Sequence, residues 1–325
     1  MKNLFLYCEF NKNIIFLYAS IKCLIILLYF YYLNYIHKIQ LLNIYKENNL
    51  KVCICTLGKE ENRYIKEFVE HYKNYGVDKI YLYDNNDIEA ERFEEVINEY
   101  VKTKFVEIID WRGVKGTATY YGIMDSCYQA NYDKYDWLIF YEIDEFLYLK
   151  EYNNIKTYLA NKKFDKCESI QLNWVHMSDN NYLFYEDKPL HIRFTEIGKN
   201  VNKKKYNRIC FVKTIIKGHL KNINITHNHL LNKNLTACDG FGKKSKVNKI
   251  ESLNPDYEHN FIRHYYSKTV QEFIDKINRG DLLRGNNKKI IEWAIEKFFL
   301  INKITIEKIK YIQKYLGKEY NLTKY

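Results

Sequence analysis

The sequence predicts an α/β fold, in which a mainly parallel sheet is flanked by helices, with a hydrophobic helix before it and a helical region after it. Short apolar segments alternate with segments of helical periodicity between residues 51 and 141. Strands that are joined by helices in this way form parallel sheets. Two further observations complete the prediction: residues 14–36 are almost entirely apolar, and residues 290–316 have helical periodicity.

The composition is that of a folded chain with a basic surface. Apolar residues make up 47% of the 325 residues, which excludes a disordered chain, and the formal net charge is +11. A lysine-rich solvated surface accounts for this charge, and attraction to phosphate-bearing substrates or to anionic lipid headgroups are the functional alternatives. The sequence contains no nucleic-acid recognition motif, so no nucleic-acid partner is expected.

The eight cysteines predict neither a zinc site nor a disulfide framework. None belongs to a C-x-x-C pair, and no His/Cys cluster has the spacing of a zinc site. Cys53 and Cys55 lie on one face of an expected strand, where each is expected to pack as a small apolar side chain.

Residues 14–36 have the length that is needed to cross a bilayer once. Lys22 opposes insertion by about 2.5–3.5 kcal/mol, but about a dozen Ile, Leu and Phe residues each return roughly 0.3–0.6 kcal/mol. We therefore expect a single-pass membrane anchor within an amino-terminal segment of residues 1–50. The alternatives are a helix that lies on the membrane surface and a mistranslated upstream extension. The flanking charges do not decide the orientation of the anchor.

The strands and helices of the α/β region follow one another at short intervals. Expected strands are apolar runs at residues 51–56, 79–83, 105–111, 137–141 and 169–174. Expected helices lie between the first four strands, at residues 64–75, 91–100 and 117–130. Gly76 follows the first of these helices as a helix stop.

The rest of the chain has a weaker pattern. Residues 176–263 are basic and rich in expected loops, and helices are predicted at residues 270–277 and 290–316. No composition shift marks a linker after residue 50. We expect one domain at residues 51–280 and a helical extension at residues 281–325.

Three carboxylates follow directly after the apolar strand 137–141. Glu142 and Asp144 are two residues apart at a strand end, which places both side chains on one face. Two hard oxygen ligands at the edge of a sheet suit Mg²⁺ or Mn²⁺, which could bridge phosphates. The alternative is that these residues only end the strand.

Asp84 follows the strand 79–83 in a similar way. Ligands of parallel α/β sheets bind at the carboxyl ends of the strands. A carboxylate at that edge can accept a hydrogen bond from an imide N–H or from a ribose hydroxyl. The alternative is that Asp84 only shapes the turn that follows it.

Several motifs, in their order and spacing over residues 51–280, resemble those of GT-A glycosyltransferases of the family 92 and family 2 type. The matching segments are Lys51–Thr56 with Lys59–Glu67, Tyr83-Asp84-Asn85, Asp110-Trp111, Cys127, Asp136–Phe140 with Ile143–Leu147, Lys213–Ile216, and Arg263–Gly280. The resemblance implies a GT-A (Rossmann-like) fold and a nucleotide-sugar donor. It also implies that Thr56, Glu61 and Asp84 lie beside the donor nucleotide.

The same resemblance implies that Glu142 and Asp144 hold a divalent metal, Mn²⁺ or Mg²⁺, together with the donor diphosphate. His264 is implied to close this site from the carboxyl-terminal side. The sequence departs from the family pattern at Glu142, where the family has Asp. Glutamate keeps the charge but adds a methylene group, so the geometry of the metal site is expected to differ.

Relatives in family 92 invert the anomeric centre, which requires a carboxylate to deprotonate the acceptor hydroxyl. Asp179 is the expected base because it follows the strand 169–175, and Glu186 and Asp187 are the alternatives. Glu60 stands in place of the family's Asn, and Tyr120 lies near the place of an expected Gln. These departures predict that this chain contacts the acceptor differently from its family relatives.

The predicted function is therefore metal-dependent, inverting transfer of a sugar, such as galactose or another hexose, from a UDP-sugar to a glycan or another acceptor. The alternative is a non-catalytic, membrane-associated protein that binds a glycan or nucleotide on a degenerate GT-A scaffold. A nucleotidyltransferase would need a glycine-rich phosphate loop after the first strand, and Leu57-Gly-Lys-Glu60 does not provide one.

Overall fold

The chain divides into two units, Met1–Asn49 and Leu50–Tyr325. The computed structural model describes residues 2–114, 117–199, 210–223, 225–226, 229–230, 235–245, 251–252, 255–280, 287–317, 320 and 322.

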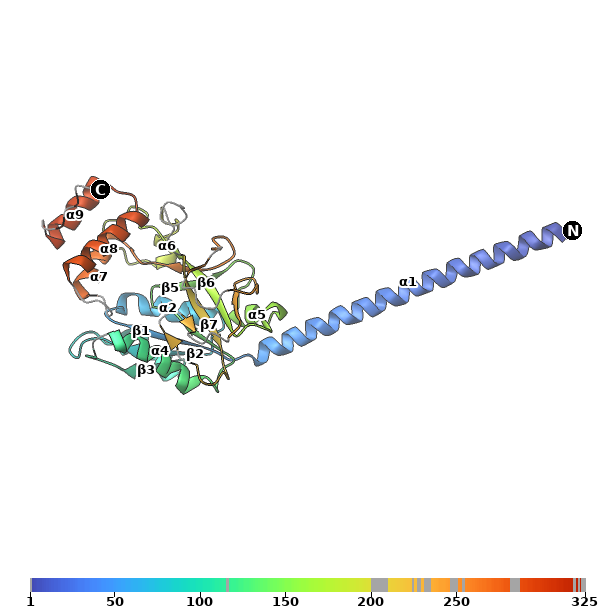
Figure 1. Ribbon diagram of the computed structural model, residues 1–325, viewed down its shortest axis with the longest axis horizontal. Coiled ribbons are helices and arrows are strands. Elements are labelled where there is room, and N and C mark those ends of the chain that lie inside the picture. Colours follow the sequence, from blue (N-terminus) through green and yellow to red (C-terminus); the bar gives the residue numbers. More distant parts are fainter. Residues whose placement is uncertain are drawn as a thin grey trace. The chain divides into compact units, whose positions relative to one another are not determined.

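The first unit is one continuous helix, α1 (Lys2–Asn49), which is drawn in blue in Figure 1. Its segment Ser20–Leu41 is long and apolar enough to cross a membrane, and none of that segment is buried in the protein. A signal sequence near an amino terminus meets the same criterion. This segment overlaps the predicted anchor at residues 14–36, of which the side chains of residues 14–19 lie outside the described part.

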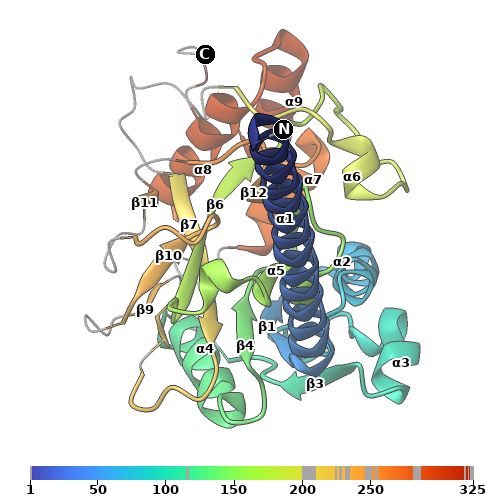
Figure 2. The ribbon, with the colours of Figure 1, turned by 90° about the vertical axis from the view of Figure 1, so that its right-hand side faces the viewer.

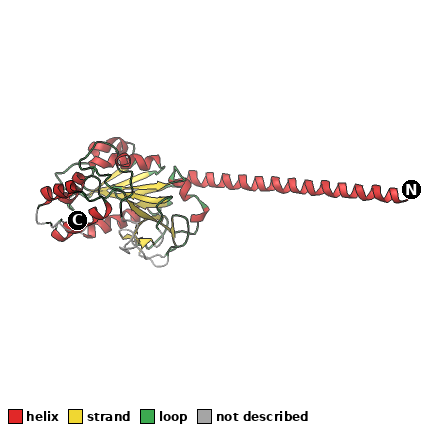
Figure 3. Ribbon diagram, turned by 90° about the horizontal axis from the view of Figure 1, so that it is seen from above, coloured by secondary structure: helices red, strands yellow, loops and turns green. Residues whose placement is uncertain are grey.

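The second unit is built on a ten-stranded sheet, with the order β3-β2-β1-β4-β7-β6-β12-β5 and with β10 and β11 paired to β6 and β7. Figure 3 shows helices on both sides of the strands. The strands are β1 (Val52–Gly58), β2 (Lys79–Asp84), β3 (Val106–Asp110), β4 (Trp137–Phe140), β5 (Glu145–Leu149), β6 (Ser169–His176), β7 (Cys210–Lys217), β10 (Ala237–Asp239), β11 (Glu251–Ser252) and β12 (Asn260–His264). A separate hairpin pairs β8 (Ile225–Thr226) with β9 (His229–Leu230).

The amino-terminal half of the sheet is parallel, as predicted. Strands β3, β2, β1 and β4 pair in parallel, and every residue of β1 is buried. Helices follow these strands: α2 (Asn62–Asn74), α3 (Glu94–Lys102) and α4 (Thr117–Asn131), with short helices at α5 (Ile155–Leu159), η1 (Lys162–Phe164) and α6 (Leu190–Arg193). The predicted α/β fold class is confirmed.

Helix α2 buries the face that its periodicity predicts. Ile65, Phe68, Val69 and Tyr72 are fully buried in the main core. The helix stops at Gly76, whose φ is +83°, and a Cβ atom there would lie 2.4 Å from the Asn154 side chain. Only glycine tolerates both the left-handed backbone and this close contact.

The carboxyl-terminal half of the sheet mixes directions, and its short strands β5 and β12 are not predicted from the sequence. Strand β12 pairs antiparallel with β5 and parallel with β6. In this register His264 lies opposite Glu145 on one side and opposite His176 on the other. This pairing brings a residue from far along the chain next to the carboxylates that follow β4.

The expectation that the cysteines form no disulfides is wrong. Cys55 in β1 is bonded to Cys127 in α4, and Cys167 is bonded to Cys238 in β10. The partners are 72 and 71 residues apart, so no local spacing in the sequence reveals them. Cys53 is free and buried, as expected of a small apolar side chain.

The last three helices share a second core. Helices α7 (Val270–Arg279), α8 (Lys288–Ile301) and α9 (Ile306–Leu316) lie together at one end of this unit (Figure 2). Thr269 and Glu272 form a capping box at the start of α7, and both carboxylate oxygens of Glu272 also accept hydrogen bonds from buried Arg193. These contacts hold α7 in place, and α7 contributes two cations to the site described next.

Candidate functional site

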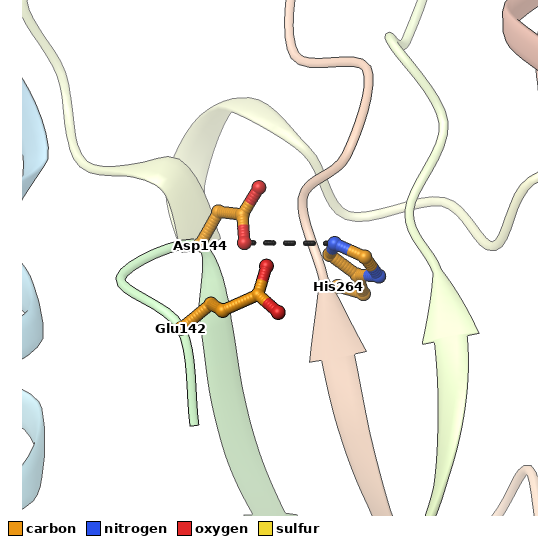
Figure 4. Close-up of side chains that lie close together, drawn as sticks. All are labelled: Glu142, Asp144 and His264. Carbon is orange, nitrogen blue, oxygen red and sulfur yellow. Dashed lines mark ion pairs between the residues drawn. The ribbon is translucent and has the colours of Figure 1, made fainter. Parts of the chain in front are cut away.

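Two carboxylates and an imidazole converge where β4 ends. Glu142 and Asp144 lie in the tight turn between β4 and β5, and His264 ends β12. One ligand atom of each of these three residues lies within 4.8 Å of the others. Figure 4 shows the two acidic side chains pointing toward His264. The turn itself is held by Glu145, whose carboxylate accepts a hydrogen bond of 2.9 Å from the Glu142 backbone N–H.

The protonation states of these residues fit a divalent cation. Burial lowers the pKa of His264 to about 4, so its imidazole is neutral at neutral pH. Burial alone would raise the pKa of Asp144, but Lys276, His264 and Lys268 together hold it well below its ordinary value. A neutral imidazole and ionised carboxylates are the forms that bind metals.

One of the candidate ligand atoms also has free bonding capacity. Asp144 Oδ1 is buried and has no hydrogen-bond partner among the described residues. His264 Nε2 lies 3.5 Å from Asp144 Oδ1. Oxygen ligands with one imidazole suit Mn²⁺ or Mg²⁺. The residues present therefore fit the metal that the resemblance implies, and the longer Glu142 belongs to the group despite replacing Asp.

Four cations surround the carboxylates, and sequence reasoning gave them no role. Lys213 Nζ lies 2.7 Å from Glu142 and 3.2 Å from Glu145. Lys276 Nζ lies 2.9 Å from Asp144 Oδ2. Lys268 and Arg279 both contact Glu61. All four belong to segments that carry the family resemblance, so these motifs could have identified them as site residues.

Glu61 lies on this basic side of the site. It is buried, and its carboxylate accepts a hydrogen bond from Arg279 in α7. Arg279 also donates to the backbone carbonyls of Lys59 and Glu60, at 2.6 and 3.0 Å. The loop after β1 is thus joined to α7. The contact between Glu61 and the nucleotide stays a prediction.

A second group of polar side chains lies where the parallel strands β1, β2 and β3 end. Thr56 is fully buried in the last part of β1. Asn86 lies two residues after the end of β2, and Trp111 directly follows β3. Thr56 Oγ1, Asn86 Nδ2 and Trp111 Nε1 are buried without a hydrogen-bond partner in the described part of the chain. Unpaired buried polar atoms are costly, and a ligand at this edge would pair them.

Asp84 lies at the same edge, but its carboxylate is already bonded within the protein. Oδ2 accepts a hydrogen bond of 2.8 Å from Arg112, and Oδ1 accepts one of 2.9 Å from the Asn86 backbone N–H. Arg112 further donates to the backbone carbonyls of Asp87, Ile88, Ala90 and Glu91. Asp84 therefore shapes the turn and its loop through Arg112, a residue that sequence reasoning missed.

Asp179, the expected base, does not lie in the group of Glu142, Asp144 and His264. It is buried and ion-paired with Lys308 of α9, and it also accepts a hydrogen bond from the Asn181 backbone N–H. Burial raises the pKa of Asp179, and Lys308 opposes this rise.

The other residues predicted from the sequence form no further candidate site among the described residues. Of the two alternative bases, Glu186 pairs with Lys188, and Asp187 accepts a hydrogen bond from Tyr185. The side chain of Tyr120 lies outside the described part.

Comparison with known proteins gives consistent matches. A model of glycosyltransferase family 92 matches residues 48–303. A glycosyltransferase family 92 protein of Ricinus communis is 27% identical over 113 residues, which are 34% of this chain and 20% of that protein. One of Oryza sativa subsp. japonica is 26% identical over 111 residues, which are 34% of this chain and 18% of that protein. The matched part spans about a fifth of these relatives.

Solved structures of the S. aureus protein TarS also match. Its crystal structure has a TM-score of 0.36 and 10% identity, covering 77% of this chain and 43% of TarS. The structure of TarS 1–349 in complex with UDP has a TM-score of 0.30 and 11% identity, covering 42% of this chain and 38% of that one. Because the family model extends over most of the sequence, the chain belongs to glycosyltransferase family 92.

Proposed function

We propose that this family 92 protein transfers a sugar from a UDP-sugar to a saccharide acceptor in a reaction that depends on a divalent metal. The observation that carries the proposal is the group of Glu142, Asp144 and His264 at the end of β4, in the sheet whose neighbouring strands end in unpaired buried polar atoms. A nucleotide diphosphate needs these two kinds of site, one for its base and one for its phosphates.

The unpaired atoms support a uracil base. Asn86 Nδ2 and Trp111 Nε1 are donors, and the Thr56 hydroxyl can donate as well. Uracil has two carbonyl oxygens that accept such hydrogen bonds. Asp84, through Arg112, would keep the loop beside the base in position.

The phosphate side combines acidic and basic groups. Glu142, Asp144 and His264 would hold the metal, which when bound would neutralise charge on the leaving diphosphate. The chain's own cations Lys268, Lys276 and Arg279 provide further positive charge close by. Positive groups placed before the reaction stabilise the charge that develops in the transition state.

The acceptor would lie beside α8. Trp293 of α8 is 44% exposed, and Lys297 one turn later lies over the Trp293 and Tyr266 rings, at 5.4 and 3.7 Å from their centroids. Lys276 also lies over the Tyr266 ring, 4.6 Å from its centroid. Exposed aromatic rings near a sugar donor site suit a saccharide, whose C–H faces pack against them.

The identity of the base, the inverting outcome and the transferred hexose belong to this proposal. Asp179 remains the proposed base for an inverting reaction. Its ion pair with Lys308 must open for Asp179 to reach an acceptor hydroxyl.

The disulfides support a location outside the reducing cytosol. Cys55–Cys127 and Cys167–Cys238 are both within the unit Leu50–Tyr325. Such bonds persist in oxidising compartments. We propose that α1 anchors the protein in a membrane and that the second unit faces the oxidising side.

A donor screen tests the proposal. The full-length protein in detergent is incubated with Mn²⁺, a mixture of oligosaccharide acceptors and either UDP-Gal, UDP-Glc or UDP-GlcNAc, and glycosylated products are identified by mass. We expect one donor to give a product heavier by one hexose or one N-acetylhexosamine. A screen without any product or UDP release would favour the non-catalytic alternative.

A further inference from the structure

We propose that Lys276 is an internal counter-ion that takes the place of the metal at Asp144 in the free protein and moves to the donor phosphates when metal and nucleotide bind. This inference rests on the proposed function and adds a residue that makes the two ligands bind cooperatively.

The contact that carries the inference joins Lys276 Nζ to Asp144 Oδ2, at 2.9 Å. Asp144 is 4% exposed, and a buried carboxylate is stable only when a positive charge or several donors compensate it. The other cationic or imidazole atoms near Asp144 are more distant, with His264 Nε2 at 3.5 Å and Lys268 Nζ at 3.9 Å. Lys276 therefore supplies the main compensation in the absence of a metal.

Lys276 is also the most exposed of the four cations. The Lys213 side chain is fully buried between Glu142 and Glu145, and the Lys268 side chain is 4% exposed between Glu61 and Asp144. By contrast, the Lys276 side chain is 28% exposed.

The Lys276 ammonium group makes a second favourable contact from the same position. Its Nζ is 4.6 Å from the centroid of the Tyr266 ring. A cation over an aromatic face at such a distance is stabilised. This contact does not depend on the charge of Asp144, so it still stabilises the ammonium group when a metal neutralises that carboxylate.

Lys276 on Oδ2 and a metal ion on Oδ1 would share one buried carboxylate, and because like charges so close repel strongly, each would weaken the binding of the other. A donor diphosphate resolves this conflict. It brings negative oxygens that accept hydrogen bonds from Lys276 and also offers ligands to the metal. Metal and nucleotide should therefore raise each other's affinity, and Lys276 should weaken metal binding only while the nucleotide is absent.

Calorimetric titration of the full-length protein in detergent tests this directly. Mn²⁺ is titrated into the nucleotide-free wild type and Lys276→Met, and UDP is then titrated into each at saturating Mn²⁺. We expect Lys276→Met to bind Mn²⁺ about tenfold more tightly without nucleotide, because the competing charge is gone, and to bind UDP about tenfold more weakly, because a charged hydrogen bond is lost. These two effects have opposite signs, which a damaged site would not produce.

Two control variants separate competition from other effects. Lys276→Arg keeps the positive charge and should keep the weak nucleotide-free binding of Mn²⁺. Lys188→Met removes an exposed lysine that pairs with Glu186, and it should leave both affinities unchanged. Thermal unfolding of each variant shows whether the fold is retained.

The outcomes distinguish this inference from the proposed function. If the wild type binds UDP and transfers sugar, but Lys276→Met binds Mn²⁺ no more tightly than the wild type without nucleotide, Lys276 is not a competitor and the inference is overturned. If Lys276→Met does not fold, Lys276→Arg provides the test: tighter nucleotide-free Mn²⁺ binding by folded Lys276→Arg than by the wild type, although the positive charge is kept, would also overturn the inference. Failure of the wild type to bind UDP at all would instead contradict the proposed function.

Discussion

Buried charged side chains at the site form ion pairs with residues from other segments of the chain, and Asp84 is an example. The Asp84 and Arg112 side chains are 3% and 9% exposed, and their ion pair is 2.8 Å long. Arg112 also binds four backbone carbonyls of the loop after β2. Asp84 therefore fixes the loop after β2, and we expect any effect of Asp84 on nucleotide binding to be exerted through this loop.

Asp84→Asn should lower both UDP affinity and stability. Removing one partner of a buried ion pair leaves Arg112 uncompensated, which costs about 3 kcal/mol. Urea unfolding and UDP titration of Asp84→Asn, Arg112→Gln and the double variant measure the coupling. We expect the free energy of unfolding of the double variant to fall by about 2 kcal/mol less than the sum of the falls in the two single variants. Purely additive losses would show that the pair does not act as a unit.

His71 predicts a dependence of stability on pH. It is partly buried on α2, and burial, together with the charges of Arg263 and His191, lowers its pKa to about 4. Below pH 6.5 the unfolded chain binds a proton that the folded chain does not bind until about pH 4, so stability is complete above pH 6.5 and falls as the pH decreases to 4.

His71→Gln keeps a donor for the Leu147 carbonyl, which the ring nitrogen contacts at 3.1 Å, but it does not titrate. The free energy of unfolding, measured in urea, should fall from pH 7 to pH 5. This fall should be on the order of 1 kcal/mol larger in the wild type than in His71→Gln. Equal pH dependence in wild type and His71→Gln would contradict this origin.

Among the elements, the parallel strands could be predicted and the mixed half of the sheet could not. Strands β1 and β4 are almost entirely apolar and buried at every residue because inner parallel strands are covered on both faces, whereas the edge strand β3 includes Glu107. Strands β5 and β12 have five residues each, and their pairing depends on a crossover from a distant segment. His264 was placed at the site by its motif, not by the strand pattern.

The disulfides connect elements in the same long-range way. Cys55–Cys127 joins β1 to α4, and both cysteines are fully buried. A crosslink between distant positions stabilises the fold by restricting the unfolded chain, typically by about 2–4 kcal/mol. The variant Cys55→Ala/Cys127→Ala should therefore lose about that amount in urea unfolding.

Cys53→Ala is the matched control for this pair, since Cys53 is buried in the same strand but free. The small loss of unfolding free energy expected for Cys53→Ala reports the packing contribution of one buried sulfur. If the wild type exposes four additional reactive thiols under denaturing, non-reducing conditions, the two disulfides do not form in the protein.

At the scale of the whole molecule, the sequence predicted an amino-terminal helix long and apolar enough to cross a membrane, the α/β fold class and the acidic group after β4. It did not predict the disulfides, the ion pair of Asp84 with Arg112, or the contact of Lys276 with Asp144. These features depend on side chains that meet only after folding, so no local pattern contains them. The base Asp179 and the sugar specificity are likewise beyond the sequence pattern and stay predictions.

Membrane attachment through α1 is tested by fractionation. The full-length chain should stay with membranes after carbonate extraction, because Ser20–Leu41 is long and apolar enough to cross a bilayer. A chain that starts at Lys51 should be released. If both chains are extracted equally, α1 is not an anchor.

The central claim, sugar transfer at the site of Glu142, Asp144 and His264, is tested most directly by one measurement: the rate of UDP release from the active donor in Mn²⁺, for wild type and Asp144→Asn. Asp144→Asn is nearly the same size but has no charge for a metal. We predict a rate at least about 100-fold lower, equivalent to about 2.7 kcal/mol of transition-state stabilisation, in a protein whose thermal unfolding transition shows that it is still folded at the assay temperature. Excess EDTA should reduce the wild-type rate to a similar level. Equal rates in both proteins, unaffected by EDTA, would contradict the account.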